Sequence, residues 1–138
     1  MKSKKNLKVL KVRDKSDNHA VKLPMLFDLP FRLLLIGKSG SGKSNLLINL
    51  LANENYPYEK LFNGDRIFIF SPSLKGDQKL LKLIDFKEIP DSNLFEEYSD
   101  ELMLELYEEI VEDVSERYQE KEKVEPTLII LDDLSFSG

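Results

Sequence analysis

The stretch FRLLLIGKSGSGKSNLLINLL, residues 31–51, decides the fold of this chain. It begins with FRLLLI, whose nearly continuous apolar character is typical of a strand buried on both faces of a parallel sheet. A glycine-rich turn follows, and leucines then recur at helical spacing at positions 46, 47, 50 and 51. The stretch therefore predicts a strand over 31–36, a tight turn, and a helix that begins near Lys43.

The turn fits the pattern G-x-x-x-x-G-K-[ST] at every specified position, with the residues Gly37, Lys38, Ser39, Gly40, Ser41, Gly42, Lys43 and Ser44. Glycines allow the backbone to bend so that successive N–H groups point at phosphate oxygens. We expect Lys43 to contact the β- and γ-phosphates of a nucleoside triphosphate and Ser44 to give its hydroxyl to Mg²⁺. A Gly/Ser-rich linker is the alternative, but linkers do not join a buried strand to an apolar helix.

A pair of carboxylates follows the last apolar run of the chain, TLIIL at 127–131. This arrangement has the form of a Walker B strand, which brings carboxylates to the sheet edge where the phosphates bind. Asp132 is then the expected partner of Mg²⁺, and Asp133 is the candidate that orients or deprotonates the attacking water. The alternative is that both acids cap a following helix or turn. The GTPase patterns D-x-x-G and N-K-x-D do not occur, so we expect ATP rather than GTP.

Strands and helices alternate through the rest of the sequence. RIFIFSP (66–72) predicts a second buried strand, residues 77–84 a short helix, and residues 99–121 a long amphipathic helix. This alternation predicts an α/β fold of the P-loop NTPase type, with a parallel sheet flanked by helices. The loop 71–77 lies at the same sheet edge as the phosphate loop, and it either contacts a substrate or is an ordinary turn.

The composition indicates a single soluble domain. Apolar residues make up 41% and charged residues 33% of the 138 positions, and no run of about 18 apolar residues exists to span a bilayer. The absence of cysteine fits a reducing intracellular compartment, and His19 is expected at the surface. We assign residues 1–22 to a basic N-terminal appendage, which includes a possible short strand at 7–13, and residues 23–138 to the nucleotide-binding domain.

The net charge of -5 is unevenly distributed. Residues 1–15 carry seven basic groups and one acidic group, whereas residues 96–125 carry thirteen acidic and three basic groups. The basic segment either contacts nucleic acid or is a solvated terminus. The acidic stretch is either a solvated helix face or a docking surface.

Three stretches together resemble the viral DNA-packaging ATPases of the FtsK/HerA superfamily, of the poxvirus type that also occurs in giant viruses and virophages. They are PFRLLLIGKSGSGKSNLLINLL (30–51), RIFIFSPS (66–73) and TLIILDDLSFSG (127–138), and the resemblance covers about residues 24–138. It implies a homo-oligomeric, ring-forming ATPase that pumps double-stranded DNA into a preformed capsid. Capsid proteins would be further partners, and the location would be the host cytoplasm or the virion.

The same resemblance implies the roles already given for Lys43, Ser44, Asp132 and Asp133. This sequence departs from the pattern of the superfamily at two points. The second acid is Asp133 where related ATPases frequently have Glu, which is one methylene longer. Members of the superfamily continue with an inserted strand that carries a polar sensor residue and with an arginine finger, so we expect the fold to be incomplete at the C-terminus.

Two other functions stay open at this point. One is a nucleotide-binding fragment that does not turn over. The other is a replication or partition ATPase of a mobile element.

Overall fold

The computed structural model describes residues 29–30, 32–35 and 42–132. The chain divides into two compact units, residues 1–61 and 62–138, and each is described by itself.

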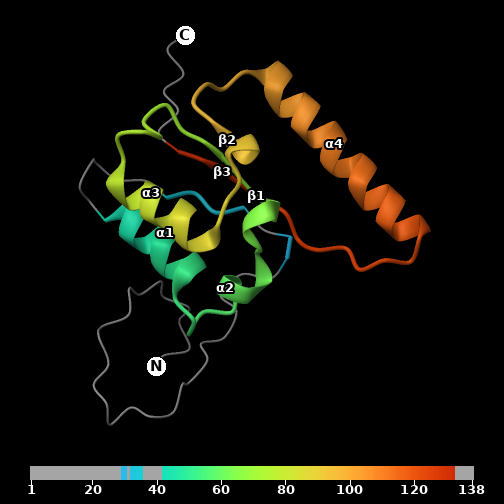
Figure 1. Cartoon of the computed structure of the whole chain (residues 1–138), viewed down its shortest axis with the longest axis horizontal. Coiled ribbons are helices and arrows are strands. Elements are labelled where there is room, and N and C mark those ends of the chain that lie inside the picture. The colour runs from blue at the N-terminus through green and yellow to red at the C-terminus, as the bar shows by residue number, and fades with distance from the viewer. Residues whose placement is uncertain (1–28, 31, 36–41, 133–138) are drawn as a thin grey trace. The chain divides into compact units, whose positions relative to one another are not determined.

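The first unit contains the helices α1 (Lys43–Ala52) and α2 (Tyr58–Leu61), coloured teal to green in Figure 1. Leu50 and Leu51 of α1 are buried, as is Tyr58 of α2, and the two helices pack against each other. The leucine spacing therefore predicted this helix correctly, including its start at Lys43.

The prediction of a strand over 31–36 is wrong for the residues described there. Residues 32–35 are not part of a strand, and the side chains of Leu33 and Leu34 are 37% and 79% exposed. A strand is defined by hydrogen bonds to a neighbouring strand, and nothing described pairs with these residues. An apolar run indicates that a segment can be buried in a sheet, but it does not supply the partner.

The second unit is an α/β unit. Its elements in chain order are the 3-10 turn η1 (Gly64–Arg66), β1 (Ile67–Phe70), α3 (Gln78–Lys87), the 3-10 turn η2 (Asp91–Asn93), β2 (Leu94–Phe95), α4 (Asp100–Gln119) and β3 (Leu128–Leu131). The predicted strands at 66–72 and 127–131 and the predicted helices at 77–84 and 99–121 correspond to β1, β3, α3 and α4. The fold-class prediction of a parallel α/β sheet flanked by helices is thereby confirmed.

The sheet has the strand order β2-β1-β3, and both pairs are parallel. The central strand β1 is the most buried, since Ile67, Ile69 and Phe70 are fully enclosed. In the register, Ile69 lies opposite Leu94 on one side and opposite Ile130 on the other. Because the strands are parallel, their carboxyl ends meet at one edge of the sheet.

The helices α3 and α4 cover opposite sides of the sheet (Figure 1). The chain steps from β1 to β2 through α3 and then back across β1 to β3 through α4. Right-handed crossovers that run in opposite directions place their helices on opposite faces. Leu80 and Leu83 of α3 and Leu106 of α4 are the helix side chains buried in this arrangement.

A close backbone contact joins the start of β1 to the end of α3. A Cβ atom built at Gly64 would collide with the backbone carbonyl of Lys87, so this position accommodates only glycine without movement. Nearby, the buried Asn93 side chain donates to the carbonyls of Asp65 and Ile67 at 3.1 and 3.0 Å. These contacts fix the amino end of β1.

Within the described residues, no helix is both long and apolar enough to cross a bilayer.

Candidate functional site

The described part of the glycine-rich turn is the start of α1. Gly42 precedes the helix with φ 98° and ψ 9°, a left-handed conformation that glycine adopts without strain, and its carbonyl accepts the first helical hydrogen bond from Leu46 at 2.9 Å. Residues 37–41, the other members of the predicted phosphate loop, lie outside the described residues. Lys43 and Ser44 are half-buried in the first turn.

This helix start has the properties of an anion site. Its N-cap residue, Gly42, has no side chain to cap the helix, and the first turn contains no acidic residue. The first backbone N–H groups of a helix have no partner within the helix, and the helix dipole adds partial positive charge at the same end. Together with the Lys43 ammonium, these groups can bind phosphate oxygens.

Asp132 lies at the carboxyl edge of the sheet in the second unit, directly after β3. Its backbone N–H donates to the carbonyl of Phe70 at 2.8 Å, so it extends the pairing of β3 with β1 by one residue. Its carboxylate Oδ2 accepts a hydrogen bond from the hydroxyl of Ser71 at 2.9 Å. Asp132 is therefore held by backbone and side chain to the end of β1, while Asp133 lies outside the described residues.

Ser71 joins the ends of all three strands. Its backbone N–H donates to Phe95 at the end of β2 at 2.9 Å, and its fully buried hydroxyl reaches Asp132 after β3. The Ser71 Oγ also lies 3.3 Å from both the backbone N–H and the Oγ of Ser73. Because the single Ser71 hydroxyl proton points to the carboxylate, Ser73 is the donor in both contacts.

The loop that follows Ser71 is an ordered turn. The backbone N–H groups of Gly76 and Asp77 both donate to the Ser73 carbonyl at 3.0 Å, and the Asp77 side chain caps α3 by accepting from Lys79 and Leu80. The sequence placed Ser71 in a loop that either contacts a substrate or is an ordinary turn, but it did not predict the bond from Ser71 to Asp132. A polar residue directly after a buried apolar strand, at the edge where parallel strands end, was the available signal.

Two of the predicted magnesium ligands, Ser44 in the first unit and Asp132 in the second, lie within the described residues. Mg²⁺ prefers oxygen ligands and keeps several waters beside substrate phosphates, so it needs few protein ligands. The Ser44 hydroxyl and the Asp132 carboxylate are donors of this kind. The described residues contain no group of three or more His, Asp or Glu side chains that could hold a metal by itself.

A second polar cluster lies at the opposite, amino edge of the sheet. The Arg66 guanidinium donates to Asp113 of α4 at 3.0 Å and to the hydroxyl of Thr127 at 2.6 Å. Asp113 also accepts from Arg117 one helical turn later, at 3.1 and 3.2 Å. The Arg66 side chain is only 12% exposed. This cluster connects α4 to the starts of β1 and β3.

A parallel α/β sheet, a G-x-x-x-x-G-K-S turn that leads into a helix, and an acid at the end of an apolar strand define the class of P-loop NTPases. Comparison with protein families narrows the class. A sequence model of the poxvirus A32 protein family matches residues 19–136, so the chain belongs to that family. No curated protein and no solved structure matches this chain.

Proposed function

We propose that the chain binds ATP with Mg²⁺ and provides the nucleotide site of a motor that moves double-stranded DNA into a viral capsid. The observation that carries this proposal is the family match over residues 19–136, which includes both the phosphate loop and Asp132. An ATPase-type function at the level of the family is consistent with the α/β fold and with the helix start at Lys43.

Each site residue has a physical task in this proposal. The backbone N–H groups of the glycine-rich turn would bind the phosphates, and Lys43 would add a point charge at the β- and γ-phosphates. When bound with the nucleotide, Mg²⁺ would neutralise charge that develops on the phosphate oxygens, with Ser44 and Asp132 as its protein ligands. Asp133 would orient or deprotonate the water that attacks the γ-phosphate.

Ser71 has a role that the Walker B pattern does not include. Its hydroxyl keeps one carboxylate oxygen of Asp132 occupied, which fixes the rotamer of that side chain. A carboxylate with one oxygen bonded to the protein still has its other oxygen for a metal or a metal-bound water.

Calorimetric titration with Mg-ATP tests the binding site. We expect Lys43→Ala to weaken ATP binding by about 100-fold or more, because it removes a charge-assisted contact to two phosphates. The matched control is Lys60→Ala, which removes an exposed lysine from the neighbouring helix α2 of the same unit. Near-normal ATP affinity in Lys43→Ala would remove the phosphate loop from the proposal.

Steady-state ATP hydrolysis with and without double-stranded DNA tests the motor. Turnover that double-stranded DNA stimulates, and that Asp133→Asn abolishes while ATP binding persists, supports the proposal. Binding without turnover would favour a nucleotide-binding fragment. Preference for forked or origin DNA would favour a replication or partition ATPase.

A further inference from the structure

The helix α4 carries an apolar row that the chain leaves exposed. Leu104, Tyr107, Val111 and Tyr118 are 56%, 60%, 43% and 79% exposed. Their spacing of three, four and seven residues puts them on one face of the helix, about a third of a turn away from the buried Leu106. Four large apolar side chains in a row on a surface helix mark a surface that a partner covers.

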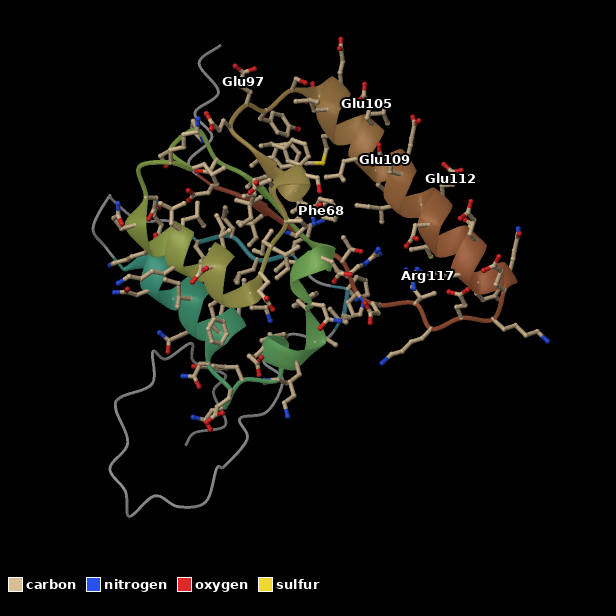
Figure 2. All side chains as sticks on the ribbon, viewed as in Figure 1. Phe68, Glu97, Glu105, Glu109, Glu112 and Arg117 are labelled. Atoms are coloured by element: carbon tan, nitrogen blue, oxygen red, sulfur yellow. The ribbon has the colours of Figure 1, made fainter. Side chains whose placement is uncertain are left out.

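An acidic stripe runs beside this row. The exposed carboxylates of α4 belong to Asp100, Glu101, Glu105, Glu108, Glu109, Glu112 and Glu116. Figure 2 shows Glu105, Glu109 and Glu112 spaced along α4. The ion pairs that α4 makes within the described residues use Asp113 and Arg117 instead. The partner of this surface must therefore be both apolar and basic.

One segment of the sequence has this composition. Residues 2–13, KSKKNLKVLKVR, hold six lysine and arginine residues and no acidic residue. Four apolar residues, Leu7, Val9, Leu10 and Val12, are interspersed among them. The segment can thus place aliphatic side chains on the apolar row and ammonium groups on the acidic stripe. A nucleic acid does not fit the same surface, because its phosphates would face at least seven carboxylates.

We propose that the apolar row and acidic stripe of α4 bind residues 2–13 of a second copy of this chain. Each copy carries one basic segment and one α4, and this pairing builds either a reciprocal dimer or a head-to-tail assembly. The pairing depends on charge and apolar surface alone and does not require the proposed nucleotide chemistry.

A charge exchange tests the pairing by sedimentation velocity over a range of protein concentrations. The segment variant is Lys4→Glu with Lys8→Glu, and the helix variant is Glu105→Lys with Glu112→Lys. Each is expected to self-associate about tenfold more weakly than the wild type, because like charges then face each other. The matched control for the helix variant is Asp85→Lys with Asp91→Lys, which makes the same change of charge at exposed positions outside α4.

An equimolar mixture of the two variants is the decisive measurement. The glutamates of one then face the lysines of the other, so mixed assembly is expected to return to within about threefold of the wild-type affinity. High salt should weaken wild-type association, since exposed ion pairs are screened.

A second variant tests the contribution of the apolar row of α4 to the pairing. Tyr107→Ser with Tyr118→Ser is expected to weaken association at high salt as well, with the helix content checked by circular dichroism.

Three results would overturn the proposal. The first is a wild-type protein that stays monomeric at every concentration. A monomer in which residues 2–13 bind α4 of the same molecule is included in this result. The second is a control variant that associates as weakly as the two test variants. The third is a mixture that does not recover.

Discussion

The Ser71 hydroxyl is the group that positions the Asp132 carboxylate. It is fully buried, and it donates its one proton to Asp132 at 2.9 Å. We expect Ser71→Ala to lower the turnover number about tenfold while the dissociation constant for ATP changes by less than about threefold, since a misplaced carboxylate affects the reaction more than phosphate binding. The free energy of unfolding of Ser71→Ala should be lower by about 1–2 kcal/mol, because a buried hydrogen bond to a charged group is lost.

Ser73→Ala is the matched control for Ser71→Ala. Ser73 is exposed and lies in the same loop, and its removal leaves the bond from Ser71 to Asp132 in place. Steady-state ATP hydrolysis, calorimetric titration and urea denaturation measure the three quantities. If Ser71→Ala and Ser73→Ala turn over alike, Ser71 does not position Asp132.

Gly64 is required by a close approach of two backbone segments. A side chain there would collide with the Lys87 carbonyl, which is backbone and cannot move aside without shifting the end of α3. We expect Gly64→Ala to lower the free energy of unfolding by about 1–3 kcal/mol.

Gly76→Ala makes the same chemical change where space exists, since the nearest atom to an added Cβ is the Ser73 carbonyl oxygen at 3.9 Å. It should be neutral or stabilise the protein by about 0.5 kcal/mol, because alanine restricts the unfolded chain. Thermal and urea denaturation compare the two variants. Equal effects at both positions would contradict the close approach at Gly64.

At the scale of elements, one ion pair connects α4 to the sheet. Arg66 is 12% exposed and Asp113 is 37% exposed, whereas the second partner of Asp113, Arg117, is 38% exposed. An ion pair with one buried partner loses less to solvent screening than a pair on the surface. The pair of Arg66 with Asp113 should therefore stabilise the unit more than the pair of Arg117 with Asp113.

A double-mutant cycle measures this difference. For Arg66→Met and Asp113→Leu we expect a coupling free energy of about 1–3 kcal/mol in urea denaturation. For Arg117→Met and Asp113→Leu we expect about 0–1 kcal/mol, as for exposed helical pairs. Coupling of equal size in both cycles would show that the lower exposure of the Arg66 guanidinium does not strengthen its ion pair.

The elements that sequence predicts well are those with a strong local pattern. The helices α1, α3 and α4 follow from apolar residues at helical spacing, and β1 and β3 follow from short apolar runs between turn residues. The strand β2 was not predicted because it has only two residues, and its strand character comes from pairing with β1. Residues 32–35 show the opposite case, in which a strand-like run has no described neighbour to pair with.

At the scale of the whole molecule, nucleotide binding should stabilise the fold. A ligand that binds only the folded state stabilises it by about 2.7 kcal/mol at a concentration 100 times its dissociation constant. We expect Mg-ATP to raise the thermal midpoint of the wild type, and Asp132→Asn to lose most of the increment that Mg²⁺ adds over ATP alone. Asp85→Asn, an exposed position on α3, is the matched control.

Differential scanning fluorimetry with ATP, with ATP and Mg²⁺, and with Mg²⁺ alone makes this comparison. The stabilisation by ATP alone should persist in Asp132→Asn, because the phosphate contacts proposed for Lys43 do not require that carboxylate. If the increment from Mg²⁺ is the same in Asp132→Asn and in Asp85→Asn, Asp132 is not the metal partner.

The sequence by itself determined the class of fold, the place of the glycine-rich turn before a helix, and the position of Asp132 after an apolar strand. These features are local, since each is a spacing of residue types along a few turns or one strand. Only the tertiary structure decided that Ser71 holds Asp132, that Arg66 connects α4 to the sheet, and that β1 lies between β2 and β3. These contacts join residues 61 and 47 positions apart, and strands far from each other in sequence. They depend on register and crossover, which no local pattern contains.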